Sequence, residues 1–215
     1  MTVGLGTGST AAYAITAIAA RVRSEGLKIR CIATSHASEE LARKNGLTIA
    51  EWHRVSRFDV TIDGADEVDP EYRMIKGGGG ALLREKIVAS STDREIIVVD
   101  QSKLKPSLGA FPLPVVVVPF GWQRTRDRLE AMFGCEITPR EAVNGEPLVT
   151  DDGLQILDLH FGGPLPEVDT LEATLKTIPG VVECGLFTGL CQHVIVGHLD
   201  GTTHEFFPGD PFTFA

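Results

Sequence analysis

The stretch TVGLGTGSTAAYAITAIAARVRSEG, Thr2–Gly26, joins a short apolar segment to a glycine turn and then to a long run of small apolar residues. The apolar segment predicts a β-strand, and the helical spacing after the turn predicts an α-helix that ends at Gly26. Strands and helices continue over KIRCIAT (28–34), SHASEELARKNG (35–46), VTIDGADEV (60–68), GALLREKIVASST (80–92) and REIIVVD (94–100). This order predicts an α/β fold in which a parallel sheet is covered by helices on both faces.

The pattern changes after Phe111. We expect a helix over 123–134, a hairpin over 147–161 with Asp152–Gly153 at its turn, a helix over 166–180 and a strand over 181–187. This order predicts a small α+β module. The segment 193–207 either closes that module or returns to the first sheet, and the tail 208–215 is expected to pack poorly. We therefore expect a Rossmann-like parallel-sheet domain over 1–113 and 190–215, and a smaller α+β, ferredoxin-like domain over 114–189.

Composition limits the classes of function. Hydrophobic residues make up 43% of the chain and charged residues 23%, as in ordinary soluble globular proteins. A net charge of -9 argues against a nucleic-acid partner. No apolar run approaches the roughly 20 residues that span a bilayer, and the N-terminus lacks the features of a signal peptide. The 4 cysteines are far apart, which favours reduced thiols in a cytoplasmic protein over a zinc site or a disulfide scaffold.

The segment GLGTGST (4–10) is the first candidate binding motif. Glycines allow main-chain N–H groups to approach an anion at a helix N-terminus, and Ser9 and Thr10 add hydroxyl donors. A tight turn without a ligand is the alternative. The dinucleotide motif needs a third glycine where Ser9 stands, and the next strand ends in Thr34-Ser35 without an acid. The phosphate of a small metabolite therefore fits better than a dinucleotide.

The segment DGADEVD (63–69) follows an apolar strand, at the end of the sheet where sites form. Its acids lack the spacing of an EF-hand calcium loop. Mg²⁺ held by two carboxylates and a solvated acidic turn remain alternatives. We favour Asp63 and Asp66 as site residues over Glu67 and Asp69.

The segment KGGGGALLREK (76–86) leads four glycines into a helix. The main-chain N–H groups of a first helical turn bind oxyanions, and Lys76 adds a positive charge. Helix statistics alone place Glu85 on the surface. A glutamate held beside a bound ligand would instead suit proton transfer.

Five blocks together resemble the ribose-5-phosphate isomerase type A family. They are VGLGTGSTA (3–11), DGADEVD (63–69), KGGGGALLREKIVA (76–89), DQSKL (100–104) and FPLPVVVVP (111–119). The similarity continues through VTDDGLQILDLHF (149–161) and IPGVVECGLF (178–187), so it covers nearly the whole chain. The resemblance implies a Rossmann-like domain with a smaller α+β domain, assembled as homodimers or homotetramers. It also implies interconversion of ribose 5-phosphate and ribulose 5-phosphate through an enediolate, without metal or cofactor.

The resemblance further implies roles for individual residues. Glu85 would be the proton acceptor. The chemistry of such a reaction then makes Lys76 and the glycine-loop N–H groups candidates to stabilise the charged oxygen, and Asp63 the candidate to move the proton in ring opening. The substrate-binding residues would be Thr7, Gly8, Ser9, Thr10, Asp63, Gly64, Ala65, Asp66, Lys76, Gly77, Gly78, Gly79 and Lys103. One departure is that family members normally carry a helix before the first strand, whereas this sequence starts almost at that strand.

Two other functions remain as alternatives. A non-catalytic sugar-phosphate sensor of the same fold would keep the phosphate loop, but it would not need Lys76 and Glu85. An aminosugar-phosphate isomerase/deaminase would carry a catalytic histidine near its acids, and His36, His53 and His160 lie outside such a block.

Overall fold

The computed structural model describes residues 1–212 of the chain, which divide into two compact units. Among the described residues, unit 1 contains 1–65, 84–104 and 189–212, and unit 2 contains 66–83 and 105–188. The sequence-based domain boundaries differ from these units, because they assign 66–83 and 105–113 to the parallel-sheet domain.

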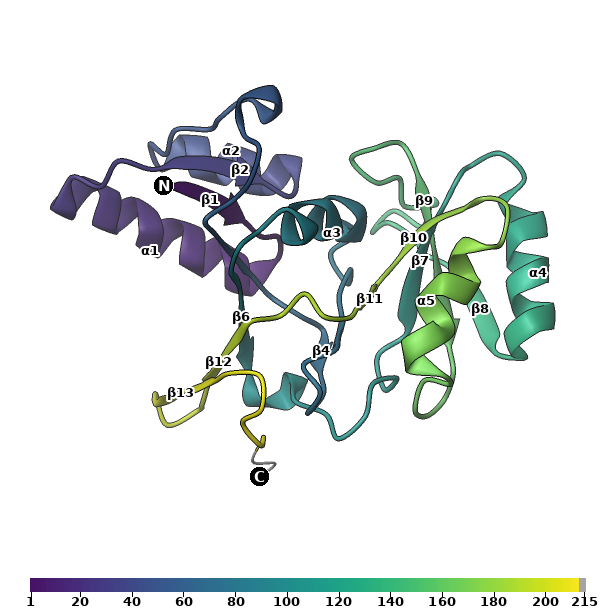
Figure 1. The fold of residues 1–215 in the computed structure, drawn as a ribbon. Helices are drawn as coiled ribbons and strands as arrows, with labels where there is room; N and C mark the ends of the chain where they lie inside the picture. Colours follow the sequence, from purple (N-terminus) through teal and green to yellow (C-terminus); the bar gives the residue numbers. More distant parts are fainter. Residues whose placement is uncertain (213–215) are drawn as a thin grey trace. The chain divides into compact units, whose positions relative to one another are not determined.

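Unit 1 is built around a six-stranded sheet (Figure 1). Its strands are β1 (Thr2–Leu5), β2 (Arg30–Ala33), β3 (Val60–Asp63), β6 (Glu95–Asp100), β12 (His193–Gly197) and β13 (Thr203–Phe206). They lie in the order β13-β12-β6-β3-β1-β2, and every neighbouring pair is parallel except β12 and β13. The expected Rossmann-like parallel sheet is therefore confirmed, and the segment 193–207 returns to it.

Helices cover both faces of this sheet. Consecutive residues of a strand point to opposite faces, and Cys31 and Ile32 of β2 belong to different clusters of buried residues. The cluster of Cys31 includes Ile15 of α1 (Ser9–Glu25) and Ala42 of α2 (His36–Lys44). The cluster of Ile32 includes Val88 of α3 (Leu82–Ser90). Burial of these helix faces is the main force that holds the layers together.

The helix ends follow from the local sequence. Gly26 ends α1 in the left-handed conformation (φ 66°), and its N–H donates to the Val22 carbonyl. Ser35 caps α2, because its side-chain oxygen accepts from the Ser38 N–H at 3.1 Å. A short 3₁₀ helix, η1 (Trp52–Arg54), precedes β3, and another, η2 (Gln101–Lys103), follows β6.

Unit 2 contains a four-stranded antiparallel sheet with two helices. Along the chain its elements are β7 (Leu113–Val117), α4 (Trp122–Phe133), β8 (Glu136–Pro139), β9 (Gln155–His160), α5 (Val168–Lys176) and β10 (Val181–Cys184). The strands lie in the order β10-β7-β9-β8, which is the βαββαβ arrangement of a ferredoxin-like fold. Leu129 of α4 and Leu171 of α5 share its buried core with Val115 of β7. The expected ferredoxin-like module is therefore confirmed.

A small antiparallel sheet completes unit 2. It consists of β4 (Glu67–Val68), β5 (Met74–Ile75) and β11 (Leu186–Phe187), with β5 in the middle. The N–H of Lys76 extends this pairing by donating to the Gly185 carbonyl at 2.9 Å. This small sheet is what holds residues 66–76 within unit 2.

One local expectation was wrong, and another was confirmed except at one residue. The turn at Asp152–Gly153 is present, but β9 pairs with β8 at 136–139 and not with the segment before the turn. The tail was expected to pack poorly, and residues 208–211 are exposed, but Phe212 is only 7% exposed and its ring lies 5.2 Å from that of Phe206. Residues 213–215 lie outside the described chain.

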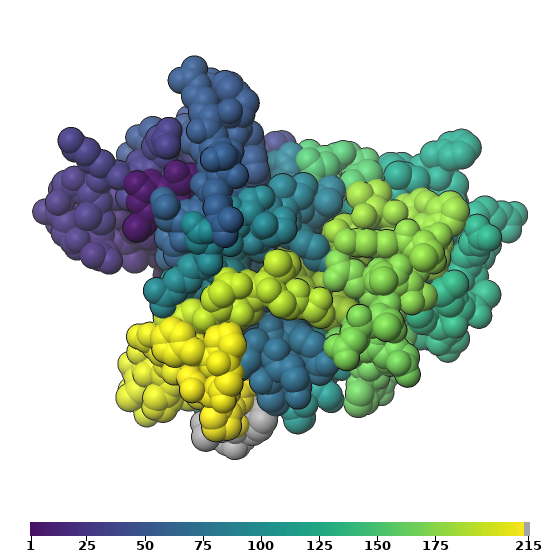
Figure 2. Space-filling model, viewed as in Figure 1, coloured from purple at the N-terminus to yellow at the C-terminus, as the bar shows by residue number. Residues whose placement is uncertain are grey.

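One edge of the unit 1 sheet is formed by β13, whose first three residues are exposed. Figure 2 shows the end of the described chain at the surface, in yellow. Within residues 1–212 no helix has both the length and the apolar character needed to cross a membrane.

Candidate active site

The chain adds β2 on one side of β1 and then adds β3, β6 and β12 on the other side. The order of the strands therefore reverses between β1 and β3. Counted along the chain, β2-β1-β3-β6-β12 is the doubly wound order 2-1-3-4-5, and ligands bind such sheets beyond the carboxyl ends of the strands at this switch point. Asp63 ends β3 at this point and is 1% exposed. Its Oδ1 accepts from the Thr7 N–H at 3.0 Å and from the Gly64 N–H at 2.7 Å. The carboxylate therefore joins the glycine turn to the loop after β3.

The glycines of the first motif are required by the neighbouring strand. A Cβ atom at Gly4 would lie 2.0 Å from Thr61 Oγ1, and one at Gly6 would lie 2.0 Å from Asp63 Oδ1. Gly8 is different, because it has space around it and a φ of 105° that few other residues adopt. Two of these glycines therefore allow β1 and β3 to meet, while the third allows the chain to turn into α1.

The N-terminus of α1 has the properties of an anion site. No side chain caps it, its first turn holds no acid, and Gly8 and Ser9 are exposed. The N–H groups at the start of a helix lack intrahelical partners and carry a partial positive charge. A phosphate group can take the place of the missing cap.

Thr7 has a different surrounding from its exposed neighbours. Its hydroxyl oxygen lies 2.7 Å from Thr34 Oγ1 and donates to Ser35 Oγ at 2.9 Å. Ser38 Oγ donates to the Gly6 carbonyl at 2.7 Å. These hydroxyl groups hold the glycine turn against the end of β2 and the first turn of α2. The sequence alone does not connect Ser35 and Ser38 with Thr7, because nothing in their spacing relates them to it.

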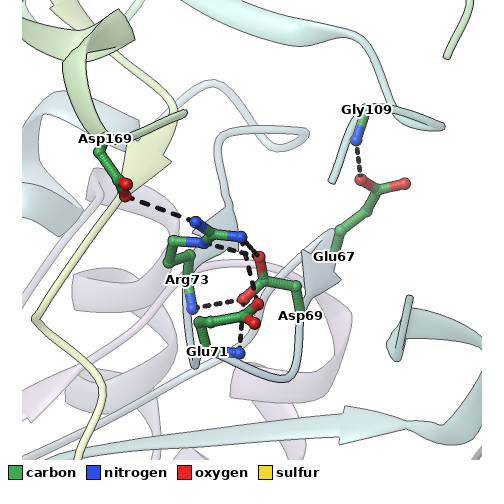
Figure 3. Close-up of polar contacts among 6 residues, drawn as sticks. All are labelled: Glu67, Asp69, Glu71, Arg73, Gly109 and Asp169. Carbon is green, nitrogen blue, oxygen red and sulfur yellow. Dashed lines mark hydrogen bonds and ion pairs between the residues drawn. The ribbon is translucent and has the colours of Figure 1, made fainter. Parts of the chain in front are cut away.

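The acids after Asp63 bind main-chain amides. Asp66 Oδ2 accepts from the Gly78 N–H at 2.7 Å. Glu67 is 1% exposed, and its two oxygens accept from the N–H groups of Gly109 and Phe111, each at 2.7 Å. Figure 3 shows Glu67 pointing at Gly109, away from the group formed by Asp69 and Arg73. Glu67 therefore ties β4 to the segment that leads into β7.

Asp69 organises the tight turn between β4 and β5. Its Oδ1 accepts from the N–H groups of Glu71 and Arg73, and its Oδ2 accepts from Arg73 Nε at 2.7 Å (Figure 3). Arg73 also lies 3.4 Å from Asp169 in the first turn of α5. The carboxylates of Glu67 and Asp69 are therefore both engaged in bonds that hold the main chain of unit 2.

The glycine loop after β5 is partly buried and partly exposed. Gly77 is buried with a φ of 108°, and a Cβ there would lie 2.9 Å from that of Leu82. Gly78 and Gly79 are exposed. Lys76, immediately before the loop, is 2% exposed, and its Nζ lies 5.5 Å from the centroid of the Phe187 ring. A cation at this distance from an aromatic face is attracted to it, so Phe187 helps to position the ammonium group.

Glu85 lies in the first turn of α3 and is 5% exposed. Helix statistics favour a surface position for it, and the structure buries it. Lys103 ends η2, which follows β6. The hydroxyl and N–H of Ser102 donate to the carboxylate of Asp100 and lower its pKa, so this cap of η2 stays ionised.

The predicted site residues fall into two sets. Unit 1 holds Thr7, Gly8, Ser9, Thr10, Asp63, Gly64, Ala65, Glu85 and Lys103, and unit 2 holds Asp66, Lys76, Gly77, Gly78 and Gly79. Within unit 1 the hydrogen bond of Asp63 joins the two loops, and Gly64 lies beside Thr10. Within unit 2 the bond of Asp66 to Gly78 joins the acidic stretch to the glycine loop.

Comparison with known proteins gives a consistent result. The family model described as ribose 5-phosphate isomerase A (phosphoriboisomerase A) matches residues 30–201. A ribose-5-phosphate isomerase A from Cereibacter sphaeroides is 50% identical over 209 residues, covering 94% of this chain and 82% of the relative. One from Dinoroseobacter shibae is 48% identical over 210 residues, covering 94% and 79%.

Solved structures agree. The ribose 5-phosphate isomerase of Plasmodium falciparum superposes with a TM-score of 0.92 at 37% identity, covering 98% of this chain and 92% of the other. A D-ribose-5-phosphate isomerase in complex with phospho-erythronic acid superposes with a TM-score of 0.91 at 35% identity, covering 96% and 90%. The chain therefore belongs to the ribose 5-phosphate isomerase A family.

Proposed function

We propose that this chain interconverts ribose 5-phosphate and ribulose 5-phosphate, with Glu85 as the group that carries the proton. The observation that carries the assignment of Glu85 is its burial, at 5% exposure, in the helix that follows the glycine loop. A carboxylate is seldom placed in such a position for stability alone. Family membership supports the reaction, and the matched motif supports the choice of this glutamate.

The reaction moves one hydrogen between C1 and C2 of the open-chain sugar. Glu85 removes the proton from C2 of the aldose, and the electrons form an enediolate with negative charge on the C1 oxygen. A proton then passes from the C2 hydroxyl to the C1 oxygen, and the carboxylic acid returns its own proton to C1. The electrons of the double bond form the new C1–H bond, and C2 becomes the carbonyl carbon of the ketose. Glu85 ends as the carboxylate that it was at the start. Because the hydrogen only moves within the sugar, neither an oxidant nor a reductant is needed.

The charged oxygen needs positive groups near it. Lys76, together with the N–H groups of Gly77 and Gly79, would supply this stabilisation, which is effective because such groups are already oriented before the reaction. Asp63 would move the proton in ring opening. Asp66, whose Oδ2 accepts from the Gly78 N–H, would orient sugar hydroxyl groups with its other oxygen.

The phosphate group of the substrate would bind at the N-terminus of α1. The main-chain N–H groups of Gly8, Ser9 and Thr10 and the hydroxyls of the last two would contact it, and Lys103 would add a positive charge. The absence of a side-chain cap and of an acid in this first turn supports this position.

The decisive experiment is a coupled assay of ribulose 5-phosphate formation, run in the presence of EDTA. We expect turnover for the wild type, and a loss of at least about 100-fold in kcat for Glu85→Gln, since a positioned base contributes about 10²–10⁴-fold. Glu25→Gln is the control, because Glu25 is exposed and pairs with Arg21 on the outer face of α1. Near-wild-type turnover of Glu85→Gln would remove the assignment of this residue.

The same assay tests the sensor alternative. A sensor would bind ribose 5-phosphate, as measured by calorimetry, without converting it. Each of the relatives reported above is named as an isomerase, and none is named as a sensor.

We also propose a homodimer or homotetramer in the cytoplasm. The resemblance to the family supports the assembly, and the four widely spaced cysteines support a reducing compartment. Light scattering after gel filtration gives the mass of the particle, and a monomer at working concentrations would contradict the first statement.

A further inference from the structure

Arg140, directly after β8, reaches the glycine loop from the ferredoxin-like part of unit 2. Its Nη1 donates to the carbonyl oxygens of Gly77 and Gly78, the second at 3.2 Å. Its Nε donates to Asp158 Oδ2 at 2.8 Å, and its Nη2 donates to Asp158 Oδ1. One planar guanidinium therefore connects a carboxylate of β9 to two consecutive carbonyl groups of the loop.

The pair is built to be rigid. The side chains of Arg140 and Asp158 are only 12% and 14% exposed, and a two-pronged bond fixes the guanidinium plane. The main chain of Arg140 is also held, because its N–H donates to the Ile156 carbonyl and its carbonyl accepts from the Leu148 N–H, each at 2.9 Å. The Arg140 side chain therefore fixes the position of the glycine loop relative to β8 and β9.

The bonds to the two carbonyl groups fix the direction of the amides that follow them. In a trans peptide the C=O and N–H groups point in opposite directions. The peptide between Gly77 and Gly78 is held at both ends, by Arg140 on its carbonyl and by Asp66 on its N–H. In the next peptide, Arg140 holds the Gly78 carbonyl, so the Gly79 N–H points away from the guanidinium.

Glycine itself cannot fix these directions. Gly77 has a φ of 108° and Gly80 a φ of 82°, and glycine rotates about its backbone bonds more readily than other residues. The short turn bond from the Gly80 N–H to the Gly77 carbonyl, at 2.9 Å, restrains only the ends of the loop. An external group is therefore needed to hold the central peptides in one orientation.

We propose that Arg140, held by Asp158, is a positioning residue that aims the Gly79 N–H at the oxygen on which negative charge develops during isomerisation. Arg140 acts through the loop and does not itself contact the substrate. The inference rests on the proposed function and adds to it Arg140, directly after β8, and Asp158 of β9, which the sequence motifs do not connect to the loop. An amide displaced by about 1 Å stabilises the charged oxygen much less, with losses of about 100-fold in rate.

The test compares Arg140→Lys and Asp158→Asn with Arg73→Lys as the matched control. Arg73 also pairs with a buried aspartate in unit 2, because its Nε and Nη2 both contact Asp69 Oδ2, and it also contacts Glu71 and Asp169. Lysine keeps the charge but cannot bond to a carboxylate and two carbonyl groups at once. We measure kcat and KM for ribose 5-phosphate, together with the melting temperature of each variant.

We expect both variants of the Arg140–Asp158 pair to lose roughly 10–100-fold in kcat, with KM changed less than about 3-fold. Arg73→Lys should lower the melting temperature about as much as Arg140→Lys does, while its kcat stays at the wild-type value. Added guanidinium ion should restore part of the kcat of Arg140→Ala and none of that of Glu85→Gln.

Two ligands separate positioning from a general loss of structure. Phospho-erythronic acid places a charged carboxylate where the enediolate oxygens form, whereas ribitol 5-phosphate keeps the phosphate without that charge. We expect Arg140→Lys to weaken binding of the first by about 10-fold or more and to leave the second unchanged. Equal weakening of both ligands, or a wild-type kcat in Arg140→Lys and Asp158→Asn, would overturn the proposal. If Arg140→Lys does not fold, Asp158→Asn decides on the same criteria.

Failure of the two proposals gives different results. If the wild-type chain forms no ribulose 5-phosphate, the proposed function itself is wrong. If the wild type turns over and the two variants turn over equally well, only the role of Arg140 is wrong.

Discussion

A single methyl group decides whether β1 and β3 can end side by side. Position 6 has no room for a Cβ, because Asp63 Oδ1 would lie 2.0 Å from it and the Asp63 Cα 2.6 Å from it. The sequence GLGTG suggests a ligand-binding loop. Two of its glycines, Gly4 and Gly6, are nevertheless required because side chains of β3 leave no room for a Cβ. This distinction needs the register Leu5↔Ile62, which local sequence patterns do not contain.

Gly6→Ala tests this steric requirement. We expect the free energy of unfolding to fall by roughly 1–3 kcal/mol, since the strands must separate and the bond between Asp63 and the Thr7 N–H must lengthen. Urea denaturation gives this number. Gly163→Ala is the control, because no atom lies within 4 Å of a Cβ built there, and its stability should change by less than about 0.5 kcal/mol. Equal stability of the two variants would contradict the steric argument.

The thiol of Cys31 gives the chain a dependence on alkaline pH. Burial raises the pKa of Cys31 to about 11, whereas the thiol of an unfolded chain ionises near pH 8.5. Between these values the unfolded state loses its proton first, so stability is complete below about pH 8.5 and falls as the pH rises to about 11. Urea denaturation of the wild type and of Cys31→Ala at pH 8, 9.5 and 11 should give curves that converge. Parallel curves would show that this thiol does not contribute.

At the scale of elements, much of the fold could be predicted from sequence. The α/β alternation, the two helices of the ferredoxin-like part and the turn near Gly153 follow from periodicity and turn residues. Strand β8 was missed, because four residues with one buried side chain, Ile137, show no clear alternation. The partner of β9 was therefore sought on the wrong side, in the chain just before the turn.

Candidate site residues could be named from sequence where a motif is continuous, as for Asp63 and the glycines. The resemblance gave Glu85 its proposed role, but helix statistics favour a surface position, so its burial was not predicted. Arg140 and Asp158 were not predictable, since the chain gives no sign that a residue after β8 returns to position 77. Asp66 and Glu67 are adjacent acids with different partners. Only the structure shows that Asp66 accepts from the Gly78 N–H, whereas Glu67 accepts from the N–H groups of Gly109 and Phe111.

Glu67→Gln tests the tie between β4 and the segment before β7. The carboxylate accepts two N–H groups, whereas an amide side chain has one oxygen and turns an NH₂ group toward the other donor. We expect a loss of about 1–3 kcal/mol, measured by urea denaturation at pH 7. Glu71→Gln should lose much less, because Glu71 is 62% exposed and bonds to Arg73 at the surface. A stable Glu67→Gln variant would show that this tie is unimportant.

At the scale of the molecule, the chain passes between the units after residues 65, 83, 104 and 188. Helix α3, Leu82–Ser90, contains one of these junctions, so it begins in unit 2 and ends in unit 1. Unfolding of one unit would break a helix that the other needs. If the two units had separate hydrophobic cores and no shared helix, each unit could unfold in a transition of its own.

We therefore expect a single thermal transition in scanning calorimetry, with equal calorimetric and van't Hoff enthalpies. Ribose 5-phosphate at 100 times its Kd should stabilise the whole transition by about 2.7 kcal/mol. Glu67→Gln should lower the same transition without splitting it. Two resolved peaks would show that the units unfold independently.

The position of β12 has a consequence for synthesis on the ribosome. Strand β6 is complete at Asp100, but its neighbour β12 begins only at His193, after the whole ferredoxin-like part. At about 5–20 residues per second, the growing polypeptide waits roughly 5–20 s before this neighbour emerges. During that interval one side of a hydrophobic strand is unpaired, which invites pairing with another nascent chain. Premature termination anywhere between these two strands would therefore leave fragments that need a chaperone.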